Sequence, residues 1–209
     1  MKIQFESQLE YQNHAINSIV NIFEGQEICQ SNFTVSAMTD NILTYQNELG
    51  IGNRLELLDD EILANVQNIQ LKNGLPQSQK LNSMDFSVEM ETGTGKTYVY
   101  LKSIFELNRK YGFTKFIIVV PSIAIKEGTY KTLEITKEHF KSQFDNVNYD
   151  YFVYDSSNLE QVRDFATSNE IRIMVINIDA FRKSFSDTSK DSKANIIHRQ
   201  NDRLNGQKP

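Results

Sequence analysis

A glycine-rich turn, METGTGKT at residues 90–97, carries the side chains of this sequence that are best suited to chemistry. Gly93 and Gly95 let backbone N–H groups turn inward around phosphate at the start of a helix. Lys96 can reach the β- and γ-phosphates, and the Thr97 hydroxyl can coordinate Mg²⁺. The turn therefore predicts binding of a nucleoside triphosphate with Mg²⁺. The alternative, a chance glycine turn, is disfavoured because the turn lies between an expected strand and an expected helix.

The start of this turn departs from the general phosphate-loop pattern G-x-x-x-x-G-K-[ST]. Met90 stands where the first glycine would be. Residues 92–97 instead resemble motif I of the superfamily-two helicases and translocases, which is written A-x-x-G-x-G-K-T. The resemblance makes Lys96 the candidate catalytic residue and Thr97 the candidate metal ligand. The candidate cofactor-binding residues of the turn are Thr92, Gly93, Thr94, Gly95, Lys96 and Thr97.

Two further segments resemble parts of the same superfamily. LEYQNHAI at residues 9–16 is similar to the segment with which these motors recognise adenine. The Gln12 amide offers a donor and an acceptor, which suits N7 and N6 of adenine. VVPS at residues 119–122 resembles motif Ia, which implies that Pro121 and Ser122 contact a nucleic-acid backbone. The alternatives are an exposed polar residue on an amphipathic helix for Gln12 and a simple strand stop for Pro121.

Alternating strands and helices are expected to position these residues. Residues 86–91 are predicted to form a strand that runs into the glycine turn, and Gly112 should end the helix that follows. The apolar run FIIVVP is typical of a strand buried on both faces. Ser156 or Ser157 is a candidate cap for a later helix. The remaining pattern predicts helices at 11–23, 55–69, 97–111, 123–144 and 159–167, and strands at 116–121, 149–155 and 171–178.

This pattern indicates a right-handed, mostly parallel α/β sheet of the RecA-like phosphate-loop class, incomplete and carrying an N-terminal helical insertion. Four segments are expected. Residues 1–24 hold the adenine-recognition-like helix, 25–85 the helical insertion, 86–183 the partial ATP-binding domain, and 184–209 a polar, disordered tail.

The composition is that of an ordinary soluble domain. The 209 residues carry a formal net charge of −5 and are 39% hydrophobic, so nucleic-acid binding must be argued locally. One cysteine, Cys29, excludes an internal disulfide and fits a reducing compartment. The N-terminus lacks the apolar core of a signal peptide, and no run is long enough to span a membrane. We therefore expect a cytoplasmic protein without a membrane partner.

Taken together, residues 86–128 closely resemble the restriction (Res) subunit of type III restriction–modification enzymes. That resemblance covers residues 86–183, with a looser match at the N-terminal helix. It implies two RecA-like motor domains followed by a nuclease, ATP-dependent movement along DNA, and a methyltransferase (Mod) partner that recognises the site.

The sequence departs from that family in one respect. No D-E-x-x box, whose carboxylates hold Mg²⁺ and position the attacking water, follows the phosphate loop. The triplet Asp59-Asp60-Glu61 lies upstream, where a charged helix start is the better interpretation. We therefore expect an N-terminal fragment that binds ATP weakly and does not hydrolyse it. The alternatives are a non-catalytic nucleotide-binding or interaction module and a fragment of another superfamily-two helicase, with a small-molecule kinase ranked last.

Overall fold

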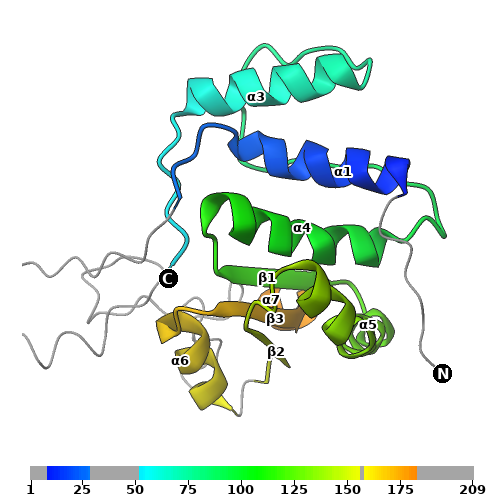
Figure 1. Ribbon diagram of the computed structural model, residues 1–209, viewed down its shortest axis with the longest axis vertical. Helices are drawn as coiled ribbons and strands as arrows, with labels where there is room; N and C mark the ends of the chain where they lie inside the picture. Colours follow the sequence, from blue (N-terminus) through cyan, green and yellow to red (C-terminus); the bar gives the residue numbers. More distant parts are fainter. Residues whose placement is uncertain (1–8, 29–51, 156–157, 183–209) are drawn as a thin grey trace, which may run out of the picture. The chain divides into compact units, whose positions relative to one another are not determined.

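The computed structural model describes residues 9–28, 52–155 and 158–182 (Figure 1). The chain divides into two compact units. The helical unit comprises Met1–Cys29, Arg54–Phe113 and Ile135–Asn146, and the sheet unit comprises Gln30–Asn53, Thr114–Glu134 and Val147–Pro209. Helix α5 (Ile123–Gln143) contributes its first part to the sheet unit and its last part to the helical unit. Each unit is described by itself below.

The helical unit contains α1 (Glu10–Val20), the short helix η1 (Asn21–Phe23), α3 (Asp59–Lys72) and α4 (Lys96–Tyr111). α1 packs on α4 (Figure 1), and η1 packs on α3. The predicted helices at 11–23 and 97–111 are confirmed to within one residue. Gly112 ends α4 in the left-handed conformation with φ of 72°, as expected for a residue that closes a helix without a Cβ.

Helix α3 begins four residues later than the predicted 55–69. Asp59, Asp60 and Glu61 occupy its first turn, where carboxylates favour the helix N-terminus. The Glu61 carboxylate also accepts a 2.8 Å hydrogen bond from the Leu58 backbone N–H, which fixes the start of the helix. The acidic triplet is therefore a helix start, as its position in the sequence indicated.

An aromatic stack forms the centre of the helical unit. Phe140 of α5 is fully buried and stacks on Phe105 of α4 with ring centroids 4.8 Å apart. It also stacks on Tyr98, in the first turn of α4, with ring centroids 5.4 Å apart. Phe144 extends the stack, with its ring 5.3 Å from that of Phe105. The helix that begins at the glycine turn is thus held by buried aromatic rings.

The sheet unit is built on three parallel strands, β1 (Lys115–Val120), β2 (Tyr149–Val153) and β3 (Ile171–Asn177), in the order β1-β3-β2. Helices α6 (Leu159–Thr167) and α7 (Ile178–Arg182) and the first part of α5 belong to the same unit (Figure 1). The predicted parallel α/β arrangement is confirmed. β3 is central, and its residues 173–176 are all buried. Because successive residues of a strand point to opposite faces, the burial of residues 173–176 shows that both faces of β3 are covered.

Two predictions about strands are wrong, and the predicted strands at 149–155 and 171–178 end earlier, at Val153 and Asn177. Residues 86–91 are not a strand, because no strand of the described chain pairs with them and a lone extended segment has no ladder of hydrogen bonds. β1 is not buried on both faces: Ile117 and Val119, which share one face, are 44% and 42% exposed. The last strand ends at Asn177, because the Asn177 side chain accepts a 2.7 Å hydrogen bond from Asp179 N and begins α7.

Some predictions fall on residues that the structure does not describe. Ser156 and Ser157, the tail at 184–209 and part of the insertion at 25–85 all lie outside the described ranges. The residue that precedes α6 is Asn158, and its side chain makes no capping hydrogen bond. The predicted segment boundaries themselves remain predictions.

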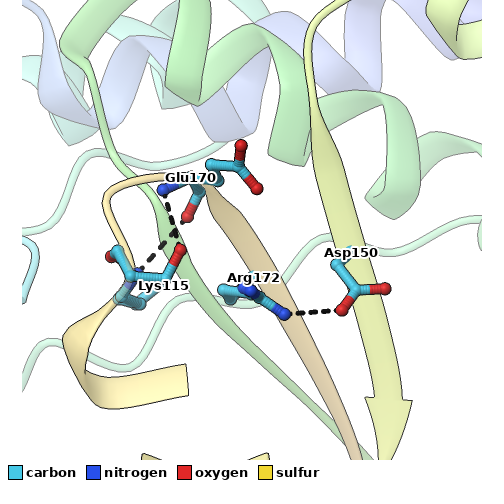
Figure 2. Close-up of polar contacts among 5 residues, drawn as sticks. Lys115, Asp150, Glu170 and Arg172 are labelled. Atoms are coloured by element: carbon cyan, nitrogen blue, oxygen red, sulfur yellow. Dashed lines mark hydrogen bonds and ion pairs between the residues drawn. The ribbon is translucent and has the colours of Figure 1, made fainter. Parts of the chain in front are cut away.

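A charged row crosses the start of the sheet. Lys115, Arg172 and Asp150 are direct register partners on β1, β3 and β2, so their side chains share one face. The Lys115 ammonium donates to the backbone carbonyls of Ser168 and Glu170, and Arg172 forms an ion pair with Asp150 (Figure 2). Burial, together with the neighbouring Arg172, lowers the pKa of Lys115 to about 8, although the nearby Glu170 carboxylate acts to raise it.

This lowered pKa predicts how stability changes with pH. Between pH 8 and 10.5 the folded state has released the Lys115 proton while the unfolded chain still binds it, so stability rises with pH across this window. The full shift corresponds to about 3 kcal/mol, and solvent screening of a half-buried side chain reduces the expected change to about 1 kcal/mol. Denaturant unfolding of the natural chain and of Lys115→Met, repeated from pH 7.5 to 10.5, measures it. The unfolding free energy of the natural chain should increase relative to that of Lys115→Met as the pH rises. A difference that stays constant with pH contradicts the lowered pKa of Lys115.

Candidate nucleotide-binding site

The glycine turn has the backbone shape that a phosphate loop needs. Gly93 and Gly95 both have φ of 84°, in the left-handed region that residues with a Cβ rarely adopt. Gly95 is the residue immediately before α4, and its carbonyl accepts the first helical hydrogen bond, from Val99 N at 3.0 Å. A Cβ placed on Gly93 would meet no atom within 4 Å, so the space beside this glycine is open. The turn can therefore admit a phosphate-sized group at the N-terminus of a sixteen-residue helix.

The Lys96 side chain forms hydrogen bonds with the backbone of the loop that precedes it. Its ammonium donates to the carbonyls of Met90 and Glu91, both at 2.9 Å. The Thr94 hydroxyl donates to the same Glu91 carbonyl at 2.7 Å. These bonds hold the lysine head group over the loop, and the side chain is exposed to solvent. A polyphosphate would offer the ammonium stronger, charged acceptors than the two carbonyls.

Gln12 reaches the loop from α1. It is buried, and its Nε2 donates to the Thr94 carbonyl at 2.9 Å. A Cβ on Gly95 would lie 2.7 Å from the same Nε2, which is closer than a real Cβ contact allows. The φ of Gly95 favours glycine, and a Cβ at this position would also displace the Gln12 side chain from the loop. An amide carries two N–H donors and one acceptor. With one N–H bound to Thr94, the second N–H and the carbonyl oxygen make the pair that N7 and N6 of adenine require.

An open pocket of about 480 Å³ lies beside the loop. One wall comes from α1, another from the chain that leads into the glycine turn, and Thr94 of the loop borders it. The lining residues are Tyr11, His14, Ala15, Ser18, Asn73, Val88, Glu89, Met90, Glu91 and Thr94.

Tyr98 and Lys102 of α4 and His139 of α5 form a polar cluster near the glycine turn. The Tyr98 hydroxyl and His139 Nε2 are 2.9 Å apart, and burial, followed by the nearby Lys102, lowers the pKa of His139. Burial likewise raises the pKa of the Tyr98 hydroxyl and lowers that of Lys102. Sequence reasoning did not single out these residues. The available signal was Lys102 within the mainly apolar segment VYLKSIFEL at residues 99–107, because a cation on a buried helix face needs a partner.

Pro121 and Ser122 lie in the sheet unit, at the carboxyl end of β1. The Ser122 hydroxyl accepts a 3.3 Å hydrogen bond from Ile125 N, so it caps α5. Val120 is paired in register with Asn177, so the ends of β1 and β3 meet at the same edge of the sheet. Ligands of open parallel sheets bind at this edge.

The structure brings together Gln12, Thr94, Gly95 and Lys96 within the helical unit. Thr92 and Gly93 belong to the same turn, and Thr97 follows Lys96 in the first turn of α4. Pro121 and Ser122 form a separate group in the sheet unit. Among the described residues no three His, Cys, Asp or Glu side chains are grouped so as to hold a metal ion. No helix in the described ranges is long and apolar enough to cross a membrane.

The sheet of parallel strands and the glycine turn at a helix N-terminus define a partial RecA-like α/β protein. The profile of the family "Type III restriction enzyme, res subunit" matches residues 7–202. The chain belongs to this family of type III restriction enzyme Res subunits, as its motifs predicted.

Curated relatives agree with this assignment. The chain is 33% identical to the Res subunit of the type III restriction-modification enzyme EcoP15I of Escherichia coli over 88% of its own length. It is 30% identical to the EcoPI Res subunit of Escherichia phage P1 over 83% of its length. A 64-residue stretch is 48% identical to the StyLTI Res subunit of Salmonella typhimurium. The chain spans about a fifth of the length of the first two relatives, 20% and 19%.

Proposed function

We propose that this chain binds ATP with Mg²⁺ at the glycine turn and forms the N-terminal nucleotide-binding part of a Res subunit. The observation that carries the proposal is the geometry of the loop: two left-handed glycines lead into α4, Lys96 stands at its first position, and Gln12 lies against Gly95. Bound Mg²⁺ would neutralise the charge of the phosphates. Thr97 would hold that ion, and Lys96 would exchange its two carbonyl partners for phosphate oxygens.

In the whole protein, we propose that ATP turnover drives movement along DNA and that this movement is coupled to cleavage. Pro121 and Ser122 would contact the DNA backbone, because they end β1 at the edge where parallel sheets meet their ligands. Membership of the Res family supports a Mod methyltransferase as the partner, because type III restriction enzymes are restriction-modification systems. The nucleotide site is proposed to serve this activity in the cytoplasm.

A nucleotide titration tests the proposed site. The 209-residue chain, titrated with ATP and Mg²⁺ in a calorimeter, should bind, and Lys96→Ala should weaken binding at least about tenfold because a charge-assisted contact is lost. Lys80→Ala is the matched control, since Lys80 is also an exposed lysine of the helical unit but lies outside the loop. Equal affinity of Lys96→Ala and the natural chain, with both folded, contradicts the proposal.

A further inference from the structure

Two lysine–asparagine pairs join α4 to α1 and to the short helix η1 that continues it. Lys102 Nζ donates to Asn13 Oδ1 at 3.2 Å. Lys110 Nζ donates to Asn21 Oδ1 at 3.1 Å. The two helices are thus joined by side-chain hydrogen bonds at two separate points.

The spacing of the pairs is the same on both helices. Lys102 and Lys110 are eight residues apart, and so are Asn13 and Asn21. Eight residues of α-helix rise about 12 Å, so two parallel helices can satisfy both pairs only in one register. A shift of α1 along α4 by one turn, about 5.4 Å, would break both hydrogen bonds. Lys102 would then stay buried without Asn13 as its acceptor.

This register decides where Gln12 lies. Gln12 is the residue before Asn13, and its amide is 2.9 Å from the Thr94 carbonyl and against the Cα of Gly95. A buried side chain in such a close contact cannot follow a shifted helix and keep its hydrogen bond. The helix register therefore controls the contact between α1 and the loop.

The two pairs differ in burial. Lys102 is 8% exposed, whereas the Lys110–Asn21 pair is exposed to solvent. A buried ammonium is costly, and a position that needed only packing would be better filled by Met or Leu. An exposed lysine contact contributes little, because water competes for both partners. Loss of the Lys102–Asn13 pair, rather than of the exposed Lys110–Asn21 pair, should therefore allow α1 to shift along α4.

We propose that the Lys102–Asn13 hydrogen bond sets the register of α1 on α4 and so positions Gln12 for discrimination between nucleobases. Lys102 is then a positioning residue of the nucleotide site. The inference rests on the proposed function, because it concerns the same site. Guanine presents an acceptor where adenine presents its N6 donor, so a correctly placed amide oxygen favours ATP over GTP. An amide oxygen that is displaced from this position does not favour ATP over GTP.

The test compares three ligands on the full 209-residue chain. ATP, GTP and inorganic triphosphate, each with Mg²⁺, are titrated against the natural chain, Lys102→Met and Lys110→Met. Lys102→Met should lower the preference for ATP over GTP about fivefold, because one hydrogen bond to the base is lost. Triphosphate affinity should stay within about twofold, because the loop itself is intact. Lys110→Met, the matched control, should leave the preference unchanged.

A second pair of variants tests the same contact from Asn13, which is only half-buried and tolerates change better. Asn13→Asp keeps an acceptor oxygen for Lys102 and should retain the preference for ATP. Asn13→Leu removes the acceptor and should abolish the preference for ATP. This pair decides the question if Lys102→Met does not fold. An unchanged preference in folded Asn13→Leu overturns the proposal, and so does an equal loss of triphosphate binding.

A measurement without nucleotide separates this inference from the proposed function. The side-chain amide resonances of Gln12 in the ¹H–¹⁵N spectrum should shift in Asn13→Leu and stay in place in Asn13→Asp and Lys110→Met. If the natural chain binds neither ATP nor triphosphate, the proposed function fails, and these resonances still decide the register. If the resonances do not move in Asn13→Leu, the register inference fails whatever the chain binds.

Discussion

Gly95→Ala is expected to destabilise the helical unit by about 2–4 kcal/mol and to weaken the binding of ATP. The substitution has two separate costs. A Cβ residue at φ of 84° is strained by about 1–2 kcal/mol. The new Cβ would also lie 2.7 Å from Gln12 Nε2, so Gln12 must move and lose its bond to the Thr94 carbonyl, which costs about 1 kcal/mol or more.

The chain provides a matched control for this prediction. Gly74 also has positive φ, 68°, but a Cβ placed there would meet no atom within 4 Å. Gly74→Ala should therefore show the cost of strain without the clash, about 1–2 kcal/mol. Urea unfolding of both variants measures the difference between the two costs. In Gly95→Ala combined with Gln12→Ala, the clash is removed, so the pair should be less destabilising than the sum of the two single changes. Equal effects of Gly95→Ala and Gly74→Ala would show that Gln12 does not lie against the loop.

Phe140→Ala is expected to cost about 3–5 kcal/mol of unfolding free energy. Phe140 is fully buried and stacks on Phe105 and Tyr98, so truncation leaves a cavity in the centre of the helical unit. Glu138→Ala, an exposed change on the same helix, should stay within about 0.5 kcal/mol. Thermal or urea unfolding followed by circular dichroism compares them.

Phe140→Leu refines the same prediction. Leucine fills part of the space but lacks the ring contacts with Phe105 and Tyr98, so an intermediate loss is expected. Because Tyr98 lies in the first turn of α4, ATP affinity should fall along with stability in this series. A Phe140→Ala chain as stable as Glu138→Ala would show that the aromatic stack does not support the helix.

Local patterns predicted most of the elements. α4, α5, α6 and the parallel strands β1, β2 and β3 lie where the periodicity placed them, because apolar spacing reports which face of an element is buried. Gly112 ends α4 as expected, since a left-handed closing residue is a local requirement. The glycine turn before α4 was likewise readable, because its shape depends on residues that are adjacent in the chain.

The prediction of a strand at 86–91 shows where such patterns are insufficient. A strand requires a partner that supplies its hydrogen bonds, and the segment's own residues do not determine whether that partner is present. The exposure of Ile117 and Val119 has a similar cause. An apolar run predicts a strand, but cover on each face comes from elements elsewhere in the chain.

By itself, the sequence determined the α/β class, the family and the glycine turn before α4, because these depend on composition and on spacing within short segments. The tertiary structure decided that Gln12 lies against Gly95, that Lys102 bonds Asn13, and that Lys115, Arg172 and Asp150 form one row across the sheet. Each of these contacts joins residues that are 20 or more positions apart. Their distances follow from helix register and strand order, which are properties of the packed chain.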